Sequence, residues 1–143
     1  MSLLKKRLIQ AFSSRIAAGP RGAQCGSAPE KLNSHVAQQL AAGGYPLYYS
    51  MSRKRGEVDF LTEGRAGEVV PLEVKSGASV RAHAALDKLL GADEFAIPRG
   101  VVLSRLNVEV EGKVVYLPWY AIFCLDEVLL PEAPLPRAVL PKI

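Results

Sequence analysis

Two short apolar runs joined by a polar segment constrain the fold of this chain more than any other feature. The first run is Gly56–Leu61 and the second is Val70–Val74, with Gly64 and Gly67 between them. Two β-type runs separated by a polar segment that contains glycine are the usual signal of a β-hairpin. The hairpin matters because it sets which side chains face a core.

Side chains on the two runs are expected to alternate, since successive strand residues point to opposite sides of a sheet. The apolar side chains would turn inward to the core, namely Val58, Phe60, Val70, Leu72 and Val74. The charged side chains would share the opposite face, namely Glu57, Asp59, Glu73 and Lys75. The pattern predicts that Asp59, Glu73 and Lys75 converge on one face, at adjacent strands.

The charged face has the composition of a site for a hard divalent cation. Mg²⁺ prefers oxygen ligands, usually one or two carboxylates with waters and substrate phosphate, and Asp59 and Glu73 can supply the carboxylates. A bound metal lowers the pKa of a coordinated water and neutralises charge on a phosphate. Lys75 leaves the strand on the same face, where it can position or deprotonate the water or hold the phosphate.

The same pattern of residues is also expected for an amphipathic hairpin whose charged face is simply exposed to water and binds no metal. Pro71 argues mildly against a plain ladder at this place. Proline has no N–H to donate and occurs at edges, strand starts or bulges. The alternation of side chains alone does not decide between a metal site and a solvated charged face.

Composition favours an intracellular, non-membrane protein with room for a nucleic-acid partner. The net charge of +4 permits such a partner without demanding it. Cys25 and Cys124 are far apart, so a reducing compartment and a cytoplasmic location are expected. No run suits a bilayer span, a secretory signal or a P-loop.

The chain is expected to divide into three parts. Residues 1–27 form a basic amphipathic helix and a Gly-rich linker, 28–127 form the main domain, and 128–143 form a Pro-rich tail. The N-terminal helix is expected to dock on the body or on a second subunit. A membrane surface, an organellar presequence and a phosphate backbone are the alternatives for it.

Periodicity and capping residues predict the order of elements in the main domain. They are a helix over 28–42, a strand over 45–50, the hairpin, a helix over 80–91, a strand over 100–104, a hairpin around Glu111-Gly112 and a short helix from Pro118. His83 and Lys88 are expected to face solvent. Arg53, Lys54 and Arg55 form a basic turn that either contacts phosphate or is simply a charged turn.

From about Lys31 to Leu125 the chain resembles the domain of unknown function at the C-terminus of predicted AAA-type ATPases, a branch of the PD-(D/E)xK nuclease superfamily. The matching segments are His35–Leu40, Tyr48–Ser50, Glu57–Phe60, Pro71–Gly77 and Leu117–Ala121. The resemblance implies a restriction-endonuclease-like αβββαβ core, with a mixed central sheet flanked by helices. It also implies DNA as the partner and Mg²⁺ (or Mn²⁺) as the cofactor. An ATPase partner and a homodimer are further expected associations of the chain.

The resemblance assigns roles to the charged residues of the hairpin. Asp59 and Glu73 would bind the metal, the backbone carbonyl of Val74 would complete the site, and Lys75 would orient the water. The result is a Mg²⁺-dependent nuclease that hydrolyses DNA phosphodiester bonds. Without a metal, one carboxylate is expected to have a raised pKa, because two adjacent buried carboxylates disfavour each other's charge.

One departure from the family supports a second hypothesis. Members often carry a glutamate on the first helix at the position that Asn33 occupies here. Glu30, one turn earlier on the same face, can partly replace it. The helix is expected to bring Glu30 or Asn33 towards the cleft. The second hypothesis is a catalytically degenerate nuclease-fold module that binds DNA or a protein partner.

Overall fold

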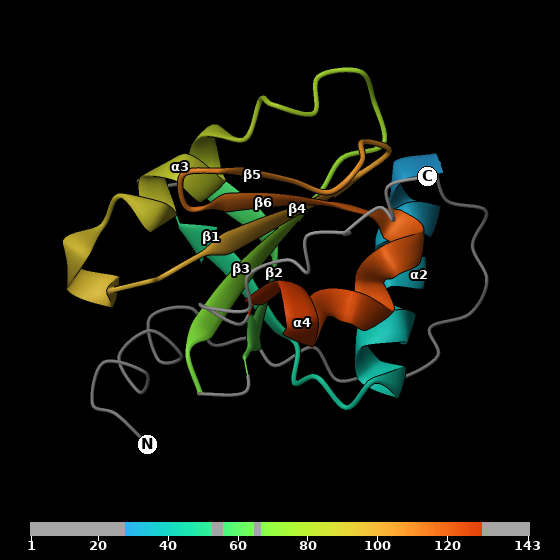
Figure 1. Cartoon of the computed structure of the whole chain (residues 1–143), viewed down its shortest axis with the longest axis horizontal. Helices are drawn as coiled ribbons and strands as arrows, with labels where there is room; N and C mark the ends of the chain where they lie inside the picture. Colours follow the sequence, from blue (N-terminus) through green and yellow to red (C-terminus); the bar gives the residue numbers. More distant parts are fainter. Residues whose placement is uncertain (1–27, 53–55, 65–66, 130–143) are drawn as a thin grey trace, which may run out of the picture.

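A six-stranded mixed sheet with helices on both faces makes up the described part of the chain (Figure 1). The computed structural model describes residues 28–52, 56–64 and 67–129. The predicted N-terminal helix, the basic turn Arg53–Arg55 and the tail beyond Leu129 lie outside these residues. None of the described helices is long and apolar enough to cross a membrane.

The strands follow the order β1-β2-β3-β4-β6-β5 across the sheet. Their bounds are β1 (Tyr48–Ser52), β2 (Gly56–Glu63), β3 (Val69–Val74), β4 (Gly100–Ser104), β5 (Glu109–Glu111) and β6 (Val114–Pro118). β3, β4 and β6 run parallel to one another, whereas β1–β2, β2–β3 and β5–β6 pair in antiparallel fashion. The carboxyl ends of the three parallel strands therefore meet at one edge of the sheet.

The helices bury two separate apolar clusters against the two faces of the sheet. On one face α2 (Ala28–Ala42), the 3₁₀ helix η2 (Trp119–Cys124) and α4 (Leu125–Leu129) pack around Leu72 and Val101. On the other face α3 (Ala84–Leu90) packs around Val58 and Val102, with η1 (Asp93–Phe95) leading on to β4. Covering both faces explains why every residue of β4 and β6 is buried.

The element order confirms the predicted α/β class and the predicted sequence of helix, three strands, helix and strand. α2 and β4 have the predicted bounds, and α4 ends close to the predicted domain boundary at 127. α3 is shorter than predicted, because Val80 and Arg81 lie in a turn and the helix begins only at Ala84. Pro71 lies inside β3, but β3 pairs with β4 only from Leu72 to Val74, so the missing N–H of Pro71 is tolerated.

The predicted alternation along β2 is wrong at its centre. Val58 packs in the α3-side cluster and Phe60 in the α2-side cluster, although strict alternation puts them on one face. The pairing with β1 explains the difference, because Tyr48 faces Leu61 while Ser50 faces Val58. Three residues of β1 (48–50) thus face four of β2 (58–61), so β2 carries one extra residue, which is a β-bulge. The prediction that one face of the hairpin carries only charge is also wrong, because apolar residues fill both faces.

Candidate functional site

Asp59 lies at the bulge of β2, where its side chain joins two other elements. Its Oδ2 accepts a hydrogen bond from the backbone N–H of Val74 on β3, at 2.7 Å. Its Oδ1 accepts one from Nδ2 of Asn33 on α2, at 3.1 Å. A bulge re-aims a side chain relative to the strand, and here Asp59 bridges β3 and α2.

Glu73 and Lys75 form an ion pair at the end of β3. Lys75 Nζ lies 2.8 Å from Glu73 Oε1, and the Glu73 side chain is only 11% exposed. Leu72 and Val74 belong to the α2-side cluster, so Glu73 between them turns towards the α3 side. The backbone N–H of Lys75 donates to the carbonyl of Leu103, which fixes the chain at the carboxyl edge.

The three charged residues lie near the same end of the sheet, where β2 begins and β3 ends, with Asp59 against α2 and the Glu73–Lys75 pair turned to the α3 side. Asp59 and Glu73 are close enough to act on each other electrostatically, and the Lys75 ammonium acts on both. The sequence predicted that they would share one flat face. Instead, the bulge in β2 brings Asp59 into contact with α2, and Glu73 turns to the α3 side of β3. The two carboxyl groups can therefore approach each other only around the end of the strands.

Both carboxyl groups have a raised pKa, where the sequence predicted one. Burial raises the pKa of Asp59 above its ordinary value of 3.8, outweighing the Val74 N–H, the Lys75 ammonium and the Asn33 amide, which lower it. Burial likewise raises the pKa of Glu73 above its ordinary 4.5, with Lys75 opposing and Asp59 adding to the rise. Each charge is thus only partly compensated by the protein.

One carboxylate oxygen at this site has no hydrogen-bond partner among the described residues. Glu73 Oε2 is buried and makes no hydrogen bond within the described residues, while Oε1 pairs with Lys75. A buried carboxylate oxygen without a partner is costly unless a ligand or ion compensates it. No cluster of three or more His, Cys, Asp or Glu side chains that could hold a metal occurs in the described ranges. Two carboxylates with the Val74 carbonyl are nevertheless a donor set that suits Mg²⁺.

The sequence predicted that the first helix brings Glu30 or Asn33 towards the acids, and in the structure the Asn33 amide donates to Asp59 Oδ1. Glu30 also lies on α2, but its side chain is outside the described part. Arg53–Arg55 is outside it as well. The strands that flank this turn, β1 and β2, end and begin at Ser52 and Gly56.

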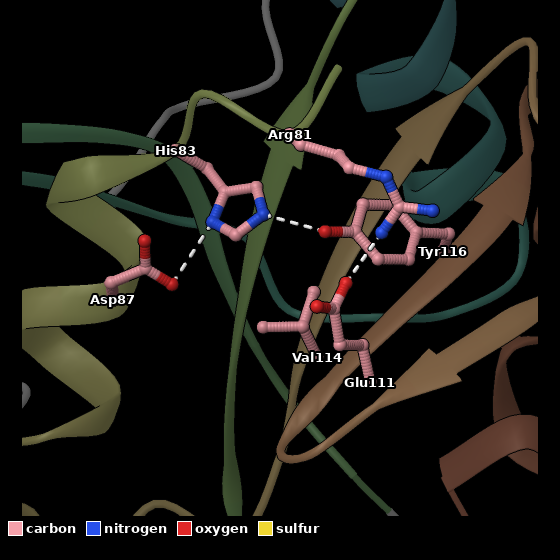
Figure 2. A pocket seen from close by; sticks show the side chains of 6 residues that line it. All are labelled: Arg81, His83, Asp87, Glu111, Val114 and Tyr116. Atoms are coloured by element: carbon pink, nitrogen blue, oxygen red, sulfur yellow. Dashed lines mark hydrogen bonds and ion pairs between the residues drawn. The ribbon is translucent and has the colours of Figure 1, made fainter.

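A second polar cluster, not anticipated from the sequence, lies on the α3 side of the sheet and lines a cleft of about 310 Å³ (Figure 2). His83 is only 7% exposed, so its predicted solvent-facing position is wrong. Its Nε2 lies 2.8 Å from the hydroxyl of Tyr116, and its Nδ1 lies 3.0 Å from Asp87 Oδ1. Asp87 follows at the i+4 position, which was the one available sequence signal.

Arg81 completes this second cluster. Its guanidinium lies 4.9 Å from the centre of the Tyr116 ring and pairs with both Glu109 and Glu111 of β5. The arginine and the histidine are thus engaged with their neighbours, as Figure 2 shows for the residues that it draws. The cluster ties the segment after Lys75 to β5 and β6, which is a structural role.

The fold and the site define an α/β domain that gathers two carboxylates and a lysine at the carboxyl edge of a mixed sheet. The chain belongs to the family described as "Domain of unknown function (DUF4143)", whose model matches residues 31–122. That match covers nearly the whole stretch over which the sequence resembles the ATPase-associated domain. No curated protein and no solved structure matches the chain.

Proposed function

We propose that this domain is a Mg²⁺-dependent nuclease that hydrolyses DNA phosphodiester bonds, with Asp59, Glu73 and Lys75 at its centre. The observation that carries the proposal is the buried Oε2 of Glu73, which has no hydrogen-bond partner among the described residues, together with the only partly compensated charge of Asp59. A divalent cation is the ligand that compensates both groups at once. The αβββαβ order and the positions of the acids at β2 and β3 are those of the PD-(D/E)xK superfamily.

The residues present fit a hard cation, and each has a defined part. Asp59, Glu73 and the carbonyl of Val74 would hold Mg²⁺ or Mn²⁺, which when bound supplies a water of lowered pKa and neutralises phosphate charge. The Val74 N–H and Asn33 hold the Asp59 carboxylate in a fixed orientation. Lys75, which pairs with Glu73, would donate a hydrogen bond to the attacking water and stabilise negative charge on the phosphate.

A catalytically degenerate module is the second candidate, and one observation favours it. Asn33 stands where relatives often have a glutamate, and its amide already donates to Asp59 Oδ1. An amide N–H on that oxygen competes with a cation for it. Such a module would bind DNA or a protein partner, for which an ATPase is the candidate that the family resemblance offers.

Cleavage of supercoiled plasmid and of branched DNA, each with Mg²⁺, Mn²⁺ or EDTA, distinguishes the two candidates. The nuclease proposal predicts cleavage that requires the metal and disappears in Asp59→Ala. Glu57→Gln removes an exposed acid two positions away on β2 and is the matched control. Metal-independent DNA binding without cleavage by purified protein would support the degenerate module.

A further inference from the structure

A row of side chains crosses the α3 side of the sheet at the level of Glu73. Glu73 of β3 pairs with Val102 of β4, which in turn pairs with Tyr116 of β6. Val102 and Tyr116 both belong to the α3-side cluster, and Glu73 turns to the same side. Neighbouring strands are about 4.8 Å apart, so the backbones of Glu73 and Tyr116 lie about 10 Å apart, with Val102 between them.

His83 contacts this row at Tyr116, and both of its ring nitrogens are held. Nε2 lies 2.8 Å from the Tyr116 hydroxyl, and Nδ1 lies 3.0 Å from Asp87 Oδ1 (Figure 2). The imidazole also acts on Glu73. Burial raises the pKa of Glu73, and His83 is, after Lys75, one of the groups that oppose the rise. The imidazole is therefore near enough to the Glu73 carboxyl group to interact with it.

The side of the sheet to which Glu73 turns is mostly apolar, since the α3-side cluster fills it. A charged carboxylate in apolar surroundings is disfavoured unless polar groups face it. Lys75 pairs with Oε1 of Glu73, whereas Oε2 has no hydrogen-bond partner among the described residues. His83 is a polar group on this side that is itself only 7% exposed, and its bonds to Tyr116 and Asp87 fix the orientation of its ring.

We infer that His83, fixed by Tyr116 and Asp87, is a positioning residue of the proposed metal site, where it gives the Glu73 carboxylate a polar neighbour and so strengthens cation binding. Groups just outside the ligands of a metal commonly tune its affinity in this way. His83 is no ligand itself, because both of its nitrogens are engaged. The inference rests on the proposed function for the metal, and it adds a residue that the acid pattern of the sequence does not include.

The coupling of the two side chains can be tested in the metal-free protein. The chain has two histidines, and His35 is exposed on α2. In nitrogen NMR spectra of the imidazole rings at one fixed pH, Glu73→Gln should shift the signals of His83 and leave those of His35 unchanged. Unchanged His83 signals would overturn the inference, whatever the protein does with metal.

The affinity for Mn²⁺ tests the consequence of this coupling. In calorimetric titration, His83→Leu should weaken Mn²⁺ binding about tenfold, the lower end of the usual effect of such residues. His83→Gln keeps an amide that can bond to Tyr116 and should retain most of the affinity. His35→Leu makes the same change at the exposed histidine and should bind Mn²⁺ as the unaltered protein does.

Two further variants separate positioning from a purely structural role. Val114→Ala removes buried apolar volume from the cleft beside His83, so it should lower Tm without changing Mn²⁺ affinity. Arg81→Ala removes the exposed ion pairs of the same segment and should also leave the affinity unchanged. Equal Mn²⁺ binding by His83→Leu and the unaltered protein, or equal losses in His83→Leu and Val114→Ala, would overturn the inference.

Failure of this inference differs from failure of the nuclease proposal. Mn²⁺ binding that depends on His83 but supports no DNA cleavage would keep the positioning role and remove the enzyme. Mn²⁺ binding and cleavage that are both indifferent to His83→Leu would remove the positioning role alone. Absence of Mn²⁺ binding by the unaltered protein would remove both.

Discussion

At the scale of single residues, the carboxyl edge of β3 holds charges that the protein compensates only in part. Asp59 receives two hydrogen bonds and Glu73 one ammonium, yet burial still raises the pKa of both carboxyl groups. Groups that cost stability in this way are typical of functional sites. Two predictions belong to these residues.

Lys75→Ala should abolish cleavage while leaving metal affinity nearly unchanged. Lysine donates hydrogen bonds and is no ligand for Mg²⁺, so its loss should affect catalysis and not cation binding. Single-turnover cleavage and calorimetric titration with Mn²⁺ measure the two properties separately. Full cleavage by the variant would exclude Lys75 from the mechanism.

Glu73→Gln should stabilise the metal-free protein more at pH 7 than at pH 4. The folded-state pKa of Glu73 is raised above 4.5, so its contribution to stability is complete below the unfolded pKa. It is lost as pH rises through the raised folded pKa, since the charged form is disfavoured in the fold. Thermal unfolding across this range gives the difference in Tm. Glu57→Gln controls for the change of net charge, and a difference in Tm that does not grow with pH would contradict the assignment.

Residue-level features of the site could be predicted from the sequence only where spacing controls them. The approach of Asn33 to Asp59 was predictable, because the predicted order of elements packs the first helix near the hairpin that carries Asp59. The bulge at Asp59 was not, because Glu57-Val58-Asp59-Phe60 alternates perfectly and only the pairing with β1 reveals the extra residue. The burial of His83 was hidden as well, because its partner Tyr116 is 33 residues away.

At the scale of elements, the cluster around Tyr116 fixes the segment between β3 and α3. His83 contacts β6, while Arg81 contacts β5 and the Tyr116 ring. Burial raises the pKa of Tyr116, with the Glu111 carboxylate adding to the rise, so the phenol is neutral and can donate to the imidazole. This arrangement replaces the first helical turn that periodicity predicts for α3.

Tyr116→Phe should lower the free energy of unfolding by about 1–3 kcal/mol, because it leaves a buried ring nitrogen of His83 without its partner. Tyr48→Phe makes the same deletion on a ring that packs against the same α3-side cluster, and it should cost less. Urea unfolding of both variants measures the two losses. Equal losses would show that the hydroxyl of Tyr116 contributes nothing specific.

At the scale of the whole molecule, the Glu73–Lys75 pair and the start of η2 lie along one edge of the sheet, at the carboxyl ends of β3 and β6, which run parallel on either side of β4. The fold class and element order could be predicted because each element is set by local periodicity. The position of η2 beside that edge could not, because it depends on the pairing of Ser104 with Pro118.

DNA binding should weaken as salt rises, and the basic turn should account for part of that dependence. Replacing Arg53, Lys54 and Arg55 by alanine should reduce the slope of log affinity against log salt by about 3, since each phosphate contact releases about one counterion. Lys88→Ala alters an exposed lysine of α3 and is the control. A slope that is unchanged in the triple variant would place the phosphate contacts elsewhere.

The central claim is that Asp59 and Glu73 share one divalent cation, and Mn²⁺ titration of the metal-free protein tests it most directly. Calorimetry or electron paramagnetic resonance should show one saturable site at millimolar or lower metal. That site should disappear in Asp59→Ala and in Glu73→Gln and persist in Glu57→Gln and Lys75→Ala. Absence of binding at millimolar Mn²⁺, or equal binding by Asp59→Ala, would contradict the claim.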